Sequence, residues 1–92
     1  MRITWDAPKR ESTLRSRGLD FADAAEVLAG PAYTFEDRRR DYGEMRKVTV
    51  GLLRGRMVLI VHTRRGEATH VISMRKANAR EQKIFRKTLD QP

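Results

Sequence analysis

Arginine, lysine, histidine and glutamate are the side chains with which this chain could perform chemistry. The chain has no cysteine, which excludes disulfides and thiolate metal ligands. None of Ser12, Ser16 and Ser73 lies in a nucleophile elbow, and no P-loop, GxGxxG or HExxH motif occurs. His62 and His70 lie on neighbouring predicted strands and could approach each other, but no carboxylate has a spacing that completes a zinc site. We therefore expect neither a metal nor a cofactor.

Cleavage of RNA without a metal is the reaction that these side chains suit. RNA supplies its own nucleophile, the 2′-hydroxyl. The protein then needs a group that takes the 2′-proton, cations that stabilise charge on the phosphorus and a donor for the departing oxygen. The candidates for these roles are Lys9, Glu44, Arg46, His62, Arg64, Arg75 and Lys76. Their spacing alone also allows the alternative that each is a solvated surface charge.

The charge of the chain points to a polyanionic partner. Twenty Lys and Arg against twelve Asp and Glu give a net charge of +8, and fifteen of the cations are arginine. Residues 1–37 have a balance of −2, whereas residues 38–92 have a balance of +10. Arginine binds phosphate through two parallel hydrogen bonds and stacks on bases. Nucleic acid or an acidic protein is therefore the expected partner, and a solvated basic surface is the alternative.

Ninety-two residues predict a single domain spanning residues 1–92, with one thin core. The longest apolar run, Met57 to Val61, is far shorter than the roughly 20 residues that span a bilayer. The first twelve residues contain no apolar run typical of a signal peptide. We expect a cytoplasmic protein without a membrane partner.

Two helices are expected in the first third of the chain. Ile3 and Trp5 alternate as in a short strand, and Asp6, Pro8 and Gly18 delimit a largely polar helix from Pro8 to Arg17. A second helix begins at Asp20 and ends at Gly30-Pro31. Its expected buried stripe is Phe21, Ala24, Ala25 and Leu28.

The rest of the chain predicts strands in meander and one last helix. A strand around Tyr33 and Phe35 precedes a charged loop, and two further strands meet at an Arg54-Gly55 hairpin turn. Met57 to Val61 is apolar throughout, which is typical of a central strand covered on both faces. A final strand runs from about Ala68 to Met74. Asn78 and Glu81 then form the capping box of a helix whose apolar stripe is Ile84, Phe85 and Leu89.

These elements predict an α+β fold in which a small antiparallel sheet carries two N-terminal helices and one C-terminal helix. The aromatic residues Trp5, Phe21, Phe35 and Phe85 are interpreted as core. Tyr42 lies among arginines in the charged loop, where either stacking on a base or packing on the sheet edge is open.

Several motifs in this order resemble the BrnT family of toxins. They are Ile3 to Glu11, Arg17 to Ala24, Asp41 to Arg46 with Gly51 after it, Val61 to Arg64, and Ile72 to Ala77 followed by Glu81. The resemblance implies a RelE-like toxin fold and an endoribonuclease that inhibits translation. It also implies a cognate antitoxin with a ribbon-helix-helix part that binds operator DNA, so that the toxin reaches operator DNA only through the antitoxin.

The chain departs from the family pattern at three positions. Arg17 replaces the usual histidine before Gly18, His70 replaces a frequent arginine, and Phe85 replaces the usual tyrosine. A group that titrates near neutral pH and a hydroxyl donor are thereby absent.

The leading hypothesis is a metal-free endoribonuclease in which Arg64 and Arg75 bind the scissile phosphate, Lys9 helps to hold it, and Glu44 or His62 moves the 2′-proton. Lys9, Arg64 and Arg75 are expected to converge on one phosphate-sized pocket. RNA is expected to contact a further set of cations, namely Arg15, Arg17, Arg46, Lys76, Arg80 and Lys83. The alternative is a non-catalytic module in which the same arginines bind RNA or an acidic antitoxin segment.

Overall fold

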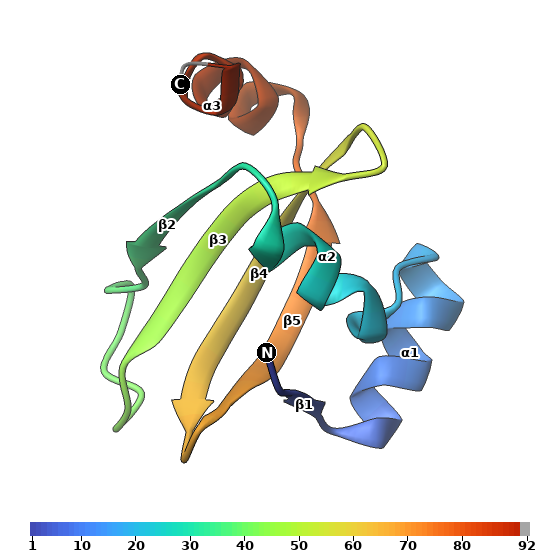
Figure 1. Cartoon of the computed structure of the whole chain (residues 1–92), viewed down its shortest axis with the longest axis vertical. Coiled ribbons are helices and arrows are strands. Elements are labelled where there is room, and N and C mark those ends of the chain that lie inside the picture. Colours follow the sequence, from blue (N-terminus) through green and yellow to red (C-terminus); the bar gives the residue numbers. More distant parts are fainter. Residues whose placement is uncertain (91–92) are drawn as a thin grey trace.

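A computed structural model describes residues 1–90 as one five-stranded sheet with helices on both faces (Figure 1). The elements follow one another as β1 (Ile3–Trp5), α1 (Ala7–Arg17), the 3₁₀ turn η1 (Phe21–Asp23), α2 (Ala24–Ala29), β2 (Ala32–Glu36), β3 (Arg46–Leu53), β4 (Arg56–Arg65), β5 (Ala68–Lys76) and α3 (Ala79–Asp90). None of the helices in these residues is both long and apolar enough to span a membrane.

The sheet is mixed, which corrects the expectation of an antiparallel sheet. Its strand order is β1-β5-β4-β3-β2, and the last four strands in this order pair antiparallel. The short β1 strand pairs parallel with β5, with Ile3 opposite Thr69 and Trp5 opposite Val71. Strands joined by short turns pair antiparallel. Between β1 and β5, by contrast, the chain passes through both helices and three strands, and this long connection allows the parallel pairing. The α+β class is as expected.

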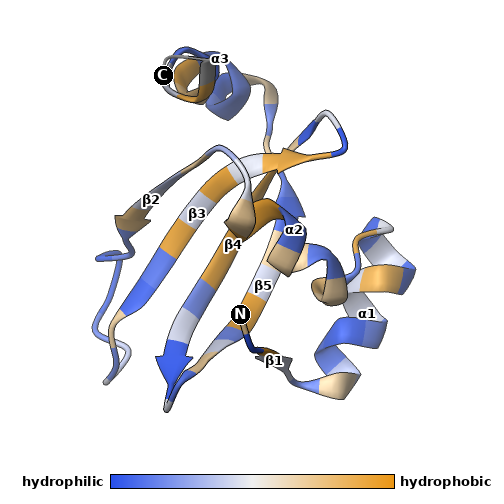
Figure 2. Cartoon of the chain, in the orientation of Figure 1, coloured by the Kyte–Doolittle hydropathy of each residue, from blue (hydrophilic) through white to orange (hydrophobic). Residues whose placement is uncertain are grey.

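One face of the sheet, here called the α2 face, holds the larger core. Val58 and Ile60 of β4 and Val71 and Met74 of β5 are buried there. They pack against the buried side chains of the helical segment, namely Leu19, Phe21, Ala24 and Val27. Figure 2 shows the apolar bands of β3 and β4 where α2 crosses them, and polar residues at the start of β3 and the end of β4.

The opposite face, here called the α3 face, is only partly covered. Val48, Val50, Met57 and Leu59 form its core beneath the start of α3. Phe85 and Leu89 of α3 pack onto this cluster. Phe85 also stacks on Phe35 with ring centroids 6.0 Å apart. The remainder of this face is not covered by a helix and carries polar side chains.

Two helical stripes differ from the sequence expectation. The second helix begins as the 3₁₀ turn η1, so its buried residues are Phe21, Ala24 and Val27, while Leu28 is half-buried. The tighter winding of a 3₁₀ turn shifts the positions that follow onto a different side of the helix. In α3, Ile84 is 57% exposed and only Phe85 and Leu89 belong to the packed stripe.

Other local expectations are confirmed. Arg54 and Gly55 form the β3–β4 turn with positive φ, and β4 is buried from Met57 to Ile60. The capping box at the start of α3 is complete, because Asn78 Oδ1 accepts from the Glu81 N–H and Glu81 Oε1 accepts from the Asn78 N–H. Strand β5 extends to Lys76, two residues beyond the expected end.

Candidate functional site

Three rows of side chains cross the α3 face, because residues paired across a sheet point to the same side. The first row is polar and consists of Thr4, His70, Thr63 and Arg46. The second row consists of Ser73, Val61, Val48 and Phe35, and the third of Arg75, Leu59, Val50 and Tyr33. The first and third rows lie four residues apart along β4, which corresponds to about 13 Å.

A β-bulge at Ile72 decides which β5 side chains share this face. Val61 pairs with Ser73 while the next β4 residue, His62, pairs with Val71, so Ile72 is the extra residue. Strict alternation would put His70 and Arg75, five positions apart, on opposite faces. The bulge restores the parity, and both side chains lie on the α3 face.

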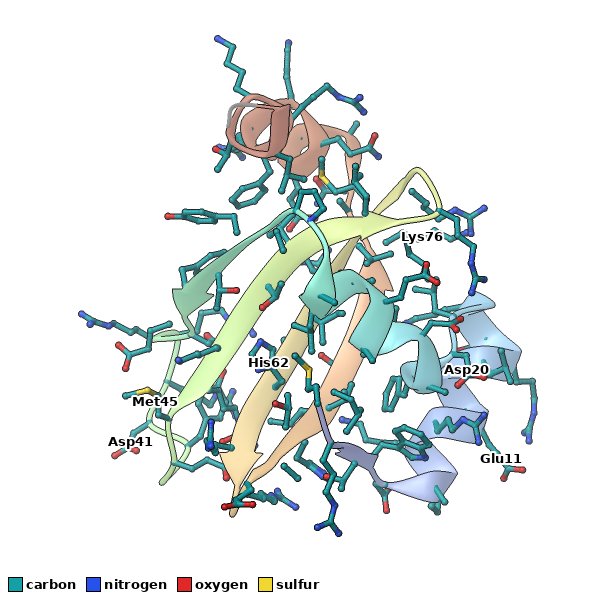
Figure 3. The ribbon with its side chains drawn as sticks, viewed as in Figure 1. Glu11, Asp20, Asp41, Met45, His62 and Lys76 are labelled. Carbon is teal, nitrogen blue, oxygen red and sulfur yellow. The ribbon has the colours of Figure 1, made fainter. Side chains whose placement is uncertain are left out.

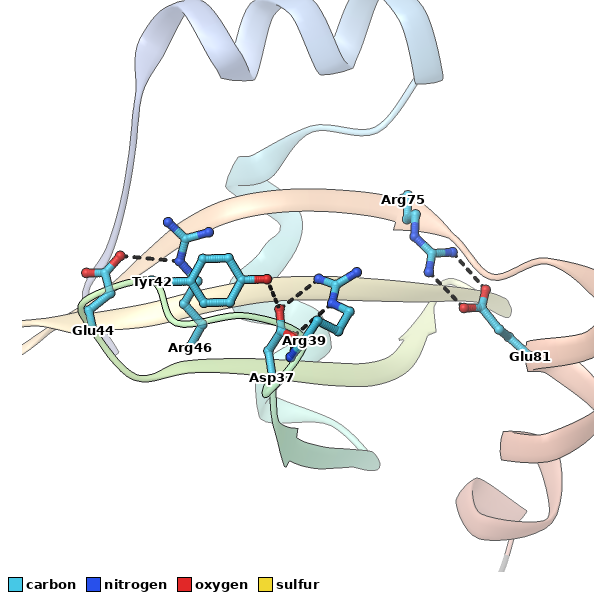
Figure 4. Close-up of polar contacts among 7 residues, drawn as sticks. All are labelled: Asp37, Arg39, Tyr42, Glu44, Arg46, Arg75 and Glu81. Carbon is cyan, nitrogen blue, oxygen red and sulfur yellow. Dashed lines mark hydrogen bonds and ion pairs between the residues drawn. The ribbon is translucent and has the colours of Figure 1, made fainter.

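The loop between β2 and β3 presents a connected polar cluster over the sheet (Figure 4). The buried carboxylate of Asp37 accepts two hydrogen bonds from the Arg39 guanidinium, at 2.8 and 2.7 Å, and one from the Tyr42 hydroxyl at 3.2 Å. The Arg46 guanidinium lies 4.1 Å from the centre of the Tyr42 ring, and Glu44 accepts from it at 3.3 Å. The hydrogen bonds from Arg39 hold the pKa of Asp37 well below its usual range.

Arg75 is held on the other side of the pocket by Glu81. Two parallel hydrogen bonds of 2.7 Å join the guanidinium to the carboxylate (Figure 4). These bonds lower the pKa of Glu81 to about 2. Glu81 is also part of the capping box, so the first turn of α3 fixes Arg75. A guanidinium has five N–H donors, and those that Glu81 and the Lys76 carbonyl do not take remain for another acceptor.

A pocket of about 470 Å³ lies over the second and third rows, and none of the first-row residues lines it. Its apolar floor is made by Phe35, Val48, Leu59 and Val61. Its polar wall is made by Glu36, Asp37, Arg38, Arg39, Ser73, Arg75 and Glu81. The site is therefore an apolar hollow edged by guanidinium groups, on the face that α2 does not cover.

His70 is the titratable side chain of the first row. Its Nδ1 lies 2.8 Å from the Thr4 hydroxyl. Burial, and secondly the nearby Arg65, lower the pKa of His70, while Glu44 and Asp6 oppose this shift. The imidazole is therefore uncharged at neutral pH. In the tautomer whose Nδ1 donates to Thr4, Nε2 keeps a lone pair that can accept a proton.

His62 lies on the other face. It pairs with Val71 of the α2-face core, and its Nε2 is hydrogen-bonded to the buried Thr49 hydroxyl at 2.7 Å (labelled over the strands in Figure 3). Burial, then Lys47, lowers the pKa of His62. The two histidines therefore do not approach each other, although their strands are neighbours, because their side chains point to opposite faces.

The structure does not bring Lys9, Arg64 and Arg75 together. The Lys9 ammonium donates to the Ile72 carbonyl at the bulge. Arg64 lies on the α2 face near the β4–β5 turn and donates to the Gly66 carbonyl, about 16 Å along β4 from the residue opposite Arg75. Only Arg75 of the three borders the α3-face pocket.

The other candidates divide between the site and the surface. Glu44 and Arg46 lie at the site, as described above. Arg17 donates to the Met74 carbonyl at 2.9 Å, so that Lys9 and Arg17 together cover the edge of β5 beyond β1. Exposed positions on α1, at the end of β5 and on α3 hold the rest, namely Arg15, Lys76, Arg80 and Lys83.

Sequence reasoning missed Arg39, Asp37 and His70 as members of this site. Arg39 and Asp37 lie in the charged loop, and their contacts depend on how that loop folds over the sheet. His70 is assigned to its face by the register of β5.

The described residues 1–90 contain no group of three or more His, Asp or Glu side chains that could hold a metal ion.

Most of the chain matches a known protein family. Residues 5–81 match the family model described as "Ribonuclease toxin, BrnT, of type II toxin-antitoxin system". The match contains all the residues of the three rows except Thr4, together with the loop cluster and Glu81. No curated protein matches the chain.

Proposed function

Because the chain belongs to the BrnT family of ribonuclease toxins of type II toxin–antitoxin systems, we propose that it cleaves RNA on the α3 face, between His70 and Arg75. The protein is thus a ribonuclease toxin with an RNA target and an antitoxin partner. The observation that carries the choice of face is that His70, Arg46 and Arg75, distant in sequence, share it.

His70 is the group that takes the 2′-proton. Its uncharged imidazole and its fixed contact with Thr4 suit a general base. The 2′-oxygen attacks the phosphorus, the bond from phosphorus to the 5′-oxygen breaks, and the 5′-oxygen leaves with a proton from solvent. The products are a 2′,3′-cyclic phosphate and a 5′-hydroxyl, and no metal takes part. Glu44 keeps Arg46 in place rather than acting as the base.

Arg46, Arg39 and Arg75 stabilise the charge that develops on the phosphate. Each is oriented by a carboxylate, respectively Glu44, Asp37 and Glu81. Fixed donors aimed at a developing charge stabilise the transition state more than mobile donors do, because they need no reorganisation during the reaction. Lys9 acts indirectly, through the Ile72 carbonyl and the bulge.

The test is cleavage of an end-labelled oligoribonucleotide in EDTA. Arg75→Ala is expected to lower kcat/KM about 10²- to 10³-fold, and His70→Ala about 10²- to 10⁴-fold. His70→Ala should also abolish the fall in activity on the acid side of the pH profile. Arg64→Ala is the matched control, since it removes an arginine from the other face, and it should cleave as the wild type does. Full activity of both Arg75→Ala and His70→Ala would exclude this site.

We further propose that the antitoxin carries a ribbon-helix-helix part that binds operator DNA, with the toxin held on the DNA only through the antitoxin. The resemblance to the family and the basic surface of the chain support this arrangement. In a gel-shift assay, the co-purified complex should bind the operator fragment. The toxin alone should bind this fragment no more tightly than it binds unrelated DNA. Equal binding of the operator by the toxin alone would contradict it.

A further inference from the structure

We propose that the α3-face pocket binds one unpaired nucleobase of the RNA, next to the scissile phosphate. This inference rests on the function proposed above, and it adds a base-binding subsite to that site. The toxin would then require single-stranded RNA, because a paired base cannot enter the pocket.

The floor of the pocket suits an aromatic ring. Phe35, Val48, Leu59 and Val61 present apolar surface from three adjacent strands. The volume of about 470 Å³ falls within the range of about 300–1,000 Å³ that is typical of small-molecule sites. A nucleobase covers such a surface with its π-face, whatever its identity.

The rim of the pocket suits the edges and the faces of a base. Arg39 and Arg75 both line the pocket, and the hydrogen bonds to Glu81 raise the pKa of Arg75 although the charge of Arg39 opposes this. Both guanidiniums are held by carboxylates in bidentate contacts. Planar guanidinium groups of this kind stack on unpaired bases.

Ser73 supplies a group that can read the edge of the base. It is half-buried in the pocket wall, in the same row as Val61. Its hydroxyl forms no hydrogen bond to another group within the part of the chain that the structure describes. A hydroxyl both donates and accepts, so it can meet either kind of group on a base edge.

The place of the pocket favours RNA over an apolar side chain of the antitoxin. Arg75 lines it, and the row of His70 and Arg46 is the next row beyond its Ser73 and Val61 wall. An RNA phosphate bound by these cations would place the adjoining base next to the pocket.

The experiment measures RNA binding without cleavage. Fluorescence anisotropy at fixed salt is recorded for a 2′-O-methyl oligonucleotide and for a set in which each position in turn lacks its base. Ser73→Leu adds bulk to the pocket wall and removes the hydroxyl, Ser16→Leu makes the same change on the exposed surface of α1, and Ser73→Ala removes only the hydroxyl. Thermal unfolding of each variant shows that it is folded.

Ser73→Leu is expected to weaken binding of the intact oligonucleotide by about 5- to 150-fold. One abasic oligonucleotide should bind the wild type as weakly as the intact oligonucleotide binds Ser73→Leu. The Ser73→Leu change should not weaken the binding of this abasic oligonucleotide further. Ser16→Leu should bind as the wild type does, and Ser73→Ala should alter only the preference among bases. Equal binding of the intact oligonucleotide by wild type and Ser73→Leu would overturn the proposal, as would a loss confined to binding of the antitoxin.

The two proposals can fail separately. If Ser73→Leu binds the intact oligonucleotide as the wild type does, while cleavage still depends on Arg75 and His70, the base pocket alone is rejected. Cleavage that does not depend on Arg75 and His70 rejects the catalytic site, whereas the anisotropy result still decides whether a base enters the pocket.

Discussion

The two faces of the sheet use the same strands for different purposes. On the α2 face, Val58 and Ile60 of β4 are fully buried beneath Phe21 and Val27. On the α3 face, neighbouring β4 residues line an open pocket, and polar residues surround them. One face therefore stabilises the fold, while the other leaves guanidinium groups and an imidazole accessible to a polyanion.

The two histidines show this difference most directly. His62 and His70 lie on adjacent strands, and burial lowers the pKa of each. His62 is bonded to Thr49 on the α2 face, where it lies outside the candidate site. His70 lies in the polar row with Arg46. The face of the sheet, rather than the residue type or the pKa, separates a structural histidine from a candidate base.

The largest effect on stability is expected from Phe21→Ala on the α2 face. The side chain is fully buried among the residues of the larger core. Its removal should lower the free energy of unfolding by about 3–5 kcal/mol, a large part of the roughly 5–15 kcal/mol that a domain has. Urea unfolding measures the loss, and RNA cleavage by the folded fraction should be unchanged. A loss below about 1 kcal/mol would show that this face does not dominate stability.

Local sequence signals predicted much of the fold. The Arg54-Gly55 turn, the Asn78–Glu81 capping box and the burial of β4 each depend on residues a few positions apart. The parallel pairing of β1 with β5 could not be predicted in this way, because it joins segments more than sixty residues apart. Nothing in the pattern around Ile72 indicates an extra residue in the strand.

The candidate site was predicted only in part, for the same reason. Glu44, Arg46 and Arg75 were identified by type and position, and the structure places all three on the α3 face. The sequence prediction named His62 and not His70 as a candidate base. Alternation along β5 does not locate the bulge that puts His70 on the face of Arg75, and Arg39 was not distinguished from its neighbours in the charged loop. Lys9 has the expected charge, but its ammonium is engaged by a backbone carbonyl.

Lys9→Met tests whether the bulge maintains the difference between the faces. Methionine retains the length of the side chain and removes the ammonium that binds the Ile72 carbonyl. We expect a loss of stability of about 1 kcal/mol and a fall in kcat, since Ser73 and Arg75 follow the bulge. Arg15→Met, an exposed position on the same helix, is the control. A fall in RNA affinity with kcat unchanged would instead mean that Lys9 contacts the substrate.

Glu81→Gln separates the anchoring of Arg75 from its charge. Loss of the capping-box carboxylate should cost about 1 kcal/mol at pH 7. The fold lowers the pKa of Glu81 from 4.5 to about 2, so its contribution is complete above pH 4.5 and is lost as the pH falls toward 2. Thermal unfolding of the wild type and the variant should therefore converge between pH 5 and pH 2. A constant difference across this range would contradict the role of the ion pair.

His62→Gln has the smallest expected effect at neutral pH and is the sharpest test of the α2 face. The fold lowers the pKa of His62 below 6.5, so below pH 6.5 the unfolded chain takes up a proton that the folded chain does not, and stability falls as the pH drops. Glutamine can keep a hydrogen bond to Thr49, and the free energy of unfolding at pH 7.5 should change by less than about 1 kcal/mol. The loss between pH 7.5 and pH 5, measured by urea unfolding, should be smaller in the variant than in the wild type. His70 contributes a loss of the same sign, so a residual slope is expected, and RNA cleavage at pH 7.5 should not change. Loss of cleavage in this variant would show that His62 on the α2 face, rather than the α3 face alone, is needed for catalysis.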